Sequence, residues 1–503
     1  MAWKGGGMLV WFVILYLMVS VGIGLYAATR VHSAKDFAVA GRSLPLPVVT
    51  ATVFATWFGA EAVFGIPATF VKEGLSGIVA DPFGSSLCLV LAGIFFSRYL
   101  YKLNIITLGD FYRMRYNRTV EVLTTVCIVV SYLGWVAAQI KALGLIFFVV
   151  TDGGVSQPAG MVLGTAIVLT YTIFGGMFSV AILDFVQMAV SMGGLLYIAS
   201  LVSDKTGGVA AVVSHARAAG KLEFFPAPDP WLWLTFVGTG MTMMLGSIPQ
   251  QDVFQRVTSA RSSRIALVGS ILGASIYFCF TFVPMFIAYA ATLIDPKLFA
   301  DLLATDSQLV LPTLVLQHTP LIAQVFFFGA VLSAIMSCSS ATLLAPSVTF
   351  AENVLKGFFP HMGDHAFLRT MRICLVVFAM MVLAFALNSE SSIFKMVENA
   401  YKITLAGAFV PLAFGAFWRR ATTQGALCAS VGGLVCWVMV EVLIGDKSPV
   451  PAQLIGFCVA VLGMLAGSLL PQWVGHKLPG RPLHELQAAA ATHHVAAHPH
   501  HHN

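Results

Sequence analysis

Charged residues are scarce in this chain, and no cysteine has a partner at a recognisable spacing. Only 10% of the 503 residues are Asp, Glu, Lys or Arg, whereas 58% are hydrophobic. A soluble domain carries about 25% charged residues, so the composition excludes a soluble protein and predicts one embedded in a lipid bilayer. All eight cysteines fall inside apolar runs, which argues against disulfides and zinc sites.

Catalytic patterns are lacking as well. The sequence has no metal-ligand spacing, no nucleophile elbow and no phosphate-binding loop, which argues against an enzyme. The net charge of +6 comes from residues in loops, so it predicts no nucleic-acid partner. The first apolar run, Met8 to Ala28, lacks the cleavage site of a signal peptide and is therefore expected to be a spanning helix.

Long apolar runs are what the sequence has in abundance. About thirteen runs reach the roughly 20 residues that a helix needs to cross a bilayer, which predicts an all-α polytopic membrane protein. They are expected near 8–28, 46–71, 76–101, 121–150, 159–175, 180–202, 231–250, 265–293, 321–345, 368–388, 396–418, 424–445 and 452–473.

The distribution of basic residues predicts the orientation. With the N-terminus placed outside, the inside loops hold 18 Lys and Arg residues and the outside segments hold 8. Cytoplasmic loops of membrane proteins are enriched in Lys and Arg. We therefore expect a multi-pass protein of a bacterial-type cytoplasmic (inner) membrane, with its N-terminus outside and its C-terminus inside.

Two of the expected helices carry residues that interrupt a helix. The second run contains Gly59, Gly65 and Pro67, and the seventh ends with Gly246 and Pro249 close together. If the first run is peripheral, these are the first and sixth helices of two five-helix halves. Broken helices at matched positions of two repeats mark the binding site of many secondary transporters. The alternative is that both are proline-kinked packing helices.

The run at 331–346 is apolar but unusually rich in hydroxyl groups. On a helix, Ser333, Ser337 and Ser340 would share one face, at i, i+4 and i+7. Small and hydroxyl residues let membrane helices pack closely. Hydroxyl oxygens can also hold a hard cation. The pattern alone leaves both interpretations open.

Three stretches together resemble the sodium:solute symporter family. They are YTIFGGMFSVAILDFVQ (171–187), IPQQDVFQRVTSA (248–260) and LSAIMSCSSATLLAPS (332–347). The resemblance extends over roughly residues 8 to 475. Within the family, ATW at 55–57 and LVLPTLVLQ at 309–317 look most like the high-affinity choline transporter branch.

The resemblance implies a LeuT-like fold, in which two inverted repeats of five helices form a core with discontinuous helices. The repeats would cover about 46–203 and 231–418, with flanking helices at 8–28, 424–445 and 452–473. Residues 1–475 would then form one transporter domain, followed by a cytoplasmic tail at 476–503. That tail ends in a histidine cluster that resembles a tag remnant or a disordered end more than a metal site.

The resemblance also implies a sodium site between the first repeat helix and the eighth. Carried over to this sequence, its ligands are backbone carbonyls and side chains at Ala55, Phe58, Ala334, Ser337 and Cys338, with the carboxylate of Asp184 nearby. Cys338 departs from the family, whose members usually have Ser or Thr there. A neutral thiol is a poor ligand for a hard ion, so the site is expected to be weakened, or to be compensated by Ser339 or Asp184.

Trp57 and Trp135 match tryptophans that line the substrate cavity of the choline branch. The face of such a ring attracts a quaternary ammonium. However, Gln250 stands where that branch has a third tryptophan, and Ser85 stands where it has a tyrosine. Half of the aromatic set of that branch is therefore missing, which argues against choline itself but leaves other quaternary ammonium substrates open.

Glu61 and Lys141 are unusual charges inside expected helices. Buried charges without partners are costly, so a mutual ion pair is the first expectation. If the pair parts for a substrate, Lys141 would hold a carboxylate and Glu61 an amine, which suits a zwitterion. A third alternative is that Lys141 supplies a positive charge in place of an ion.

The sequence thus predicts a sodium-coupled symporter that imports a small organic solute, such as a zwitterion, a quaternary ammonium or an amino acid, by alternating access. No organic cofactor is expected, and the oligomeric state is left open. Two alternatives are a transporter-like nutrient sensor with little flux and a proton-coupled symporter that uses Glu61 and Lys141. The short tail argues against a sensor fused to a signalling domain.

Overall fold

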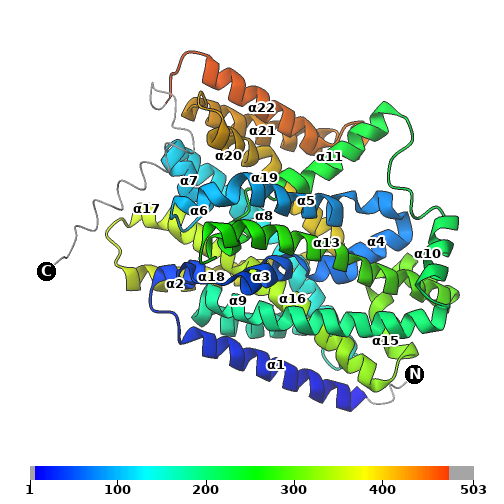
Figure 1. Ribbon diagram of the computed structural model, residues 1–503. Helices are drawn as coiled ribbons and strands as arrows, with labels where there is room; N and C mark the ends of the chain where they lie inside the picture. Colours follow the sequence, from blue (N-terminus) through cyan, green and yellow to red (C-terminus); the bar gives the residue numbers. More distant parts are fainter. Residues whose placement is uncertain (1–5, 475–503) are drawn as a thin grey trace.

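The computed structural model describes residues 6–474, and helices account for nearly all of the regular structure in that range (Figure 1). The histidine cluster of the sequence analysis lies outside the described residues. It comprises His493, His494, His498, His500, His501 and His502.

Nine helical segments of the described chain are long and apolar enough to cross a membrane. A helix suits a membrane span because its backbone hydrogen bonds are made within the segment. They are α1 (Gly6–Ala28), the run Leu75–Lys102 that includes α5 (Ser85–Leu91) and α6 (Arg98–Lys102), α8 (Arg118–Val150), α9 (Gln157–Thr206), α13 (Ser263–Ile294), α16 (Leu321–Phe350), α18 (Asp364–Asn388), α21 (Thr423–Leu443) and α22 (Ala452–Leu469).

Three pairs of helices in the described chain meet at a sharp bend, and each pair taken together is long and apolar enough to cross a membrane. The first pair is α3 (Leu46–Trp57) with the segment Glu61–Glu73, which contains α4 (Ile66–Glu73), and it bends by 57°. The second is α11 (Pro230–Gly246) with α12 (Gln251–Thr258), which bends by 45°. These two confirm the interruptions predicted from glycine and proline. The third, α19 (Ile393–Gly407) with α20 (Phe409–Phe417), bends by 47° and was not predicted.

Shorter helices cap the two ends of the bundle. They are α2 (Ala34–Val39), α7 (Leu108–Arg115), α10 (Val209–Ala218), α14 (Pro296–Thr305), α15 (Val310–His318), α17 (Lys356–Phe358) and the single turns η1 (Ala40–Arg42), η6 (Ser307–Leu309), η7 (Ala351–Leu355) and η8 (Gly445–Lys447).

The 50-residue α9 reverses direction at Gly176, whose φ of 51° and ψ of −134° are not helical. Near its start, Gly160 packs against Phe147 in the last turn of α8. Near its end, Lys205 donates to the carbonyl of His318. One cavity is lined by both that last turn of α8 and His318, so the two ends of α9 lie on the same side. The arms of α9 correspond to the expected helices 159–175 and 180–202, although the total of thirteen spans stays a prediction.

The two predicted broken helices run side by side in opposite directions. Leu44, just before α3, donates its N–H to the carbonyl of Ser259, 3.0 Å away, just after α12. Arg261 returns a bond of 2.8 Å to the carbonyl of Leu44. Both helices also contact α16, and residues at both breaks, such as Gly59 and Gln250, are buried.

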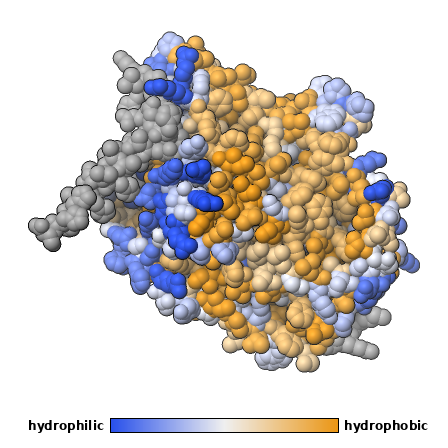
Figure 2. Space-filling model, in the orientation of Figure 1, coloured by the Kyte–Doolittle hydropathy of each residue, from blue (hydrophilic) through white to orange (hydrophobic). Residues whose placement is uncertain are grey.

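On the face shown in Figure 2, apolar residues cover the middle of the molecule between two more hydrophilic ends. Exposed large apolar side chains such as Trp11, Phe95, Val130 and Phe385 contribute to the apolar surface. Such a surface is stable only against lipid. The chain is therefore a multi-pass membrane protein, and the predicted orientation of its ends stays a prediction.

Candidate ion and substrate site

The break after α3 exposes backbone groups that a continuous helix would satisfy. Phe58, with a φ of −85° and a ψ of 75°, ends the helix, so the last carbonyls of α3 lose their usual partners. The hydroxyl of Ser337 on α16 donates to the carbonyl of Ala55 at 2.9 Å. On the other side of the break, the N–H of Ala60 donates to the amide oxygen of Gln139 at 2.8 Å. Side chains from α8 and α16 thus replace the missing backbone partners.

The structure brings the residues of the predicted sodium site together. Cys338 packs against Gly59, directly after Phe58, so closely that a Cβ on the glycine would lie 2.6 Å from the cysteine Cβ. Asp184 on α9 accepts a hydrogen bond of 2.6 Å from Thr52 on α3. Ala334 lies one helical turn before Cys338 on α16.

The donor set suits a hard cation except at one position. Ser337 uses its proton on the Ala55 carbonyl, which leaves its oxygen lone pairs available to an ion. One carboxylate oxygen of Asp184, Oδ1, is buried and accepts no hydrogen bond from the described residues. Cys338 contributes only sulfur. Ser339 donates to the carbonyl of Ile335 in its own helix at 2.6 Å, which does not favour its proposed role as a substitute for Cys338.

Beside the predicted sodium site lie five aromatic rings, which we call the aromatic cage: Trp57, Tyr132, Trp135, Tyr277 and Tyr401. The ring of Trp57 meets Trp135 at 6.3 Å and Tyr277 at 6.4 Å between centroids, both nearly perpendicular. Tyr401 lies 5.4 Å from Trp135 and 6.4 Å from Trp57, and Tyr132 stacks on Trp135 at 5.7 Å. All five side chains are at most 2% exposed.

Three carboxylates adjoin the cage. Asp252 on α12 accepts hydrogen bonds from the indole N–H of Trp57 at 3.0 Å and from the hydroxyl of Tyr132. Asp81 accepts from the hydroxyl of Tyr277 and Glu61 accepts from Gln139 at 2.8 Å. Glu61 and Asp81 are close enough to interact electrostatically. Asp252 and Asp81 therefore lie at the polar edges of the rings that donate hydrogen bonds to them.

Two of the predicted cavity residues, Ser85 and Gln250, form hydrogen bonds to other buried side chains of the protein. Ser85 donates to Asp81 at 2.6 Å, so it orients a carboxylate of the cage. Gln250, in the break between α11 and α12, donates to Ser131 and Thr404, each at 3.2 Å.

The predicted ion pair between Glu61 and Lys141 is wrong. Lys141 donates to the backbone carbonyls of Ser389 and Ser391 in the loop before α19. Glu61 is bonded to Gln139 instead. Lys141 lies two residues after Gln139 on α8, and side chains two apart on a helix point to different faces.

Sequence reasoning missed the three tyrosines of the cage and two of its carboxylates. Tyrosines are ordinary residues of membrane helices, so no pattern marked them. Asp81, however, lies inside the expected span 76–101, and the argument applied to Glu61 holds for it too, whereas Asp252 lies two residues beyond the expected span 231–250. A charge in a spanning helix is costly and is by default a candidate functional residue.

Arg256 on α12 connects the ion site with the cage. Its side chain is fully buried, and its Nε donates to the hydroxyl of Thr56 at 2.5 Å. The guanidinium lies within electrostatic range of both Asp184 and Asp252. Its two terminal nitrogens make no hydrogen bond within the described chain. One positive charge is thus shared between two carboxylates.

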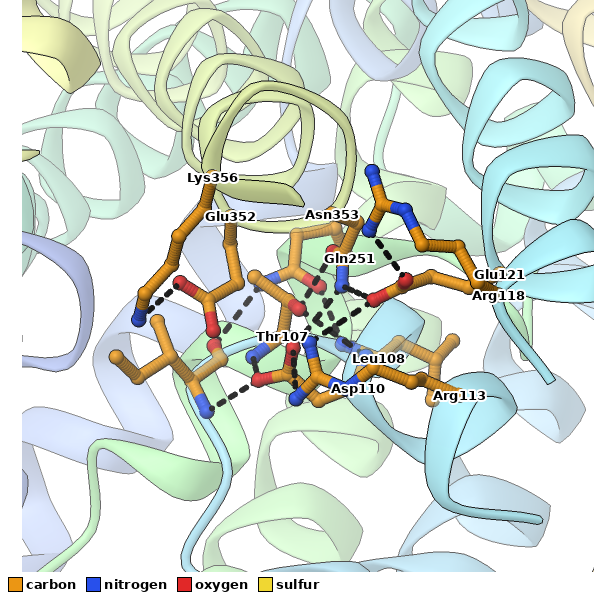
Figure 3. Close-up of polar contacts among 11 residues, drawn as sticks. Thr107, Leu108, Asp110, Arg113, Arg118, Glu121, Gln251, Glu352, Asn353 and Lys356 are labelled. Carbon is orange, nitrogen blue, oxygen red and sulfur yellow. Dashed lines mark hydrogen bonds and ion pairs between the residues drawn. The ribbon is translucent and has the colours of Figure 1, made fainter. Parts of the chain in front are cut away.

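A second polar cluster joins residues from the first and second halves of the chain (Figure 3). Asn353 in η7 lies between Asp110 and Glu121 and donates to each at 3.0 Å. Arg118 pairs with Glu121 at 2.9 Å, and Gln251 of α12 accepts from the N–H of Leu108 at 2.8 Å. This network holds α7 and α8 against α12 and the end of α16.

Residues 37–433 match the sequence profile of the sodium:solute symporter family. The chain belongs to that family. It is 26% identical over 450 residues to the human high affinity choline transporter 1, covering 85% of this chain and 75% of the relative. It is 23% identical over 489 residues to the osmoregulated proline transporter OpuE of Bacillus subtilis, covering 91% and 93% respectively. These relatives are transporters, not enzymes.

Solved structures agree with this membership at the level of the fold. A Na+-coupled sialic acid symporter in its substrate-bound outward-open state superposes with a TM-score of 0.80 at 18% identity, covering 95% of this chain and 99% of that one. The nucleobase-cation symporter Mhp1 in a closed conformation gives a TM-score of 0.58 at 15% identity, covering 86% and 93%. The predicted LeuT-like fold is confirmed, and the bounds of its two repeats stay a prediction.

Proposed function

We propose that this protein is a sodium-coupled symporter of a small organic cation. The observation that carries the proposal is the aromatic cage bordered by Glu61, Asp81 and Asp252. Ring faces attract cations electrostatically, by about 2 kcal/mol or more when the site is desolvated. The negatively charged carboxylates at the ring edges also attract a cation.

The charges around the cage disfavour a zwitterion or an anion. A substrate carboxylate would face three protein carboxylates, whereas Arg256, the nearby cation, already interacts electrostatically with Asp184 and Asp252. The predicted partner for a carboxylate, Lys141, is engaged at the loop carbonyls of Ser389 and Ser391. Among the relatives, the names of the choline transporters point to a cationic solute, and those of the proline transporters to a zwitterion.

The proposed coupling to sodium rests on a short stretch of backbone. Ala55 and Phe58, two predicted ion ligands, flank Trp57, which belongs to the cage. An ion that holds these carbonyls against Ser337 also holds the indole ring in place. Sodium and substrate would then each raise the affinity of the site for the other, because coupling between two sites is reciprocal. This arrangement favours sodium over the proton-coupled alternative, which relied on a Glu61–Lys141 pair.

Ligand-dependent thermal stability of the purified protein tests the proposal. Choline, protonated amines, proline, glycine betaine and short carboxylates would each be added in sodium and in potassium. Binding to the native state raises apparent stability by mass action. We expect stabilisation by organic cations in sodium and little in potassium. Stabilisation by zwitterions alone would refute a cation site, and equal effects in both salts would refute sodium coupling.

A further inference from the structure

The buried carboxylates around the predicted sodium site and the cage would not be neutralised by one sodium ion and a substrate with a single positive charge. Glu61, Asp81, Asp184 and Asp252 are each at most 2% exposed, and the buried guanidinium of Arg256 lies within electrostatic range of Asp184 and Asp252. If all are ionised, they leave a net charge of three negatives. One sodium ion at the predicted site leaves two. Unpaired buried charges are costly, so the site favours a ligand that supplies both missing positive charges.

From this balance and the geometry of the cage, we propose that the substrate is a dication with two protonated amino groups, such as a linear diamine. This inference rests on the proposed function and specifies its substrate class.

The hydrogen bonds of the carboxylates fit ionised groups. An ionised carboxylate has only acceptors. Asp252 accepts from Trp57 and Tyr132, and Asp81 accepts from Ser85 and Tyr277. In each case the donors are hydroxyl or indole groups.

The carboxylates are also distributed over different parts of the cage. Asp252 comes from α12 and is bound at the edge of Trp57, whereas Asp81 comes from the Leu75–Lys102 run and is bound to Tyr277. Glu61 interacts with Asp81, so this pair forms one negative pole and Asp252 forms another. Two ammonium groups joined by an apolar chain would each meet a carboxylate, while the chain between them would contact ring faces.

The hydroxyl of Tyr401 in the cage also favours a ligand with protonated amino groups. Tyr401 is fully buried, and its hydroxyl has no hydrogen-bond partner within residues 6–474. It lies within electrostatic range of both Asp252 and Glu61. Buried polar groups are almost always hydrogen-bonded in native structures. A protonated amine brings N–H donors for this oxygen, whereas a quaternary ammonium brings none.

The test compares 1,4-diaminobutane, butylamine and choline as probes of the purified full-length protein in sodium. Affinities would be measured by titration calorimetry and by thermal stabilisation. We expect the diamine to bind at least about tenfold tighter than butylamine, since a second charge-assisted hydrogen bond contributes about 1.5 kcal/mol or more. Equal affinities for diamine and monoamine would overturn the dication while leaving a sodium-coupled cation symporter intact. If no cation binds in sodium, both proposals fail.

Variants identify the groups responsible. Asp252→Asn and Glu61→Gln should each reduce the preference for the diamine over butylamine by about tenfold, because each removes one counter-charge. Glu441→Gln, which removes an exposed carboxylate on α21, is the control and should leave the preference unchanged. A preference that survives both cage variants would overturn the assignment of the carboxylates. Because the readout is a ratio of affinities within one variant, partial loss of folded protein does not affect it.

Discussion

Replacing Ser337 with alanine removes one oxygen from the predicted sodium site and breaks its bond to the Ala55 carbonyl. Ser337 is 1% exposed and its hydroxyl lies 2.9 Å from that carbonyl. A hydrogen bond or ligand contact to a charged group contributes about 1.5–3 kcal/mol. Since each 1.4 kcal/mol is a factor of ten, the apparent dissociation constant for sodium should rise about 10- to 150-fold.

The assay is a sodium titration of thermal stability without any organic ligand, at constant total ionic strength with potassium as the replacing ion. Ser339→Ala is the matched control, because Ser339 is two residues away on α16 and its hydroxyl bonds within its own helix. The control should keep the sodium dependence of the parent protein. If Ser337→Ala lowers the melting temperature but leaves the sodium dependence unchanged, the hydroxyl serves packing and the reasoning is refuted.

Three further predictions test other parts of the structure. Cys338→Ser should tighten sodium binding by about tenfold or less, since an oxygen replaces a soft sulfur; an unchanged titration would place the ion elsewhere. Trp57→Phe keeps a ring but removes the donor to Asp252, so calorimetry should show the affinity for an amine falling about tenfold; an unaltered affinity would exclude the indole N–H. Asn353→Ala deprives two buried carboxylates of a shared donor and should cost about 1–3 kcal/mol of stability by thermal unfolding. The exposed Asn388→Ala is its control, and equal melting temperatures for the two would show that the network does not hold the halves together.

Much of the fold could be predicted because the bilayer imposes length and composition on every span. The apolar runs marked the membrane helices, and Gly59 and the Gly246–Pro249 stretch marked two real breaks. The third break, between Gly407 and Phe409, lies in an apolar run that also contains a glycine. Glycine occurs too often in membrane helices for that signal to be specific.

The candidate site was only half predictable. Trp57, Trp135, Ser337 and Asp184 were found through family motifs, and the structure places each of them in the aromatic cage or among the residues of the predicted sodium site. The partner of Lys141 was predicted wrongly because a charge inside an expected helix was assumed to pair with an opposite charge. Its actual partners are backbone carbonyls, which no sequence pattern reveals.

The sequence by itself determined the class of protein, its membrane helices, the breaks in two of them and the family to which it belongs. These features are local, since hydropathy and helix-breaking residues act within one segment. The packing of distant helices was needed to show which residues surround the candidate substrate site. Tyr132, Tyr277 and Tyr401 come from three helices, and Asp81 and Asp252 from two others. Their proximity depends on how helices far apart in the chain pack across the two breaks, and that packing is a property of the whole bundle.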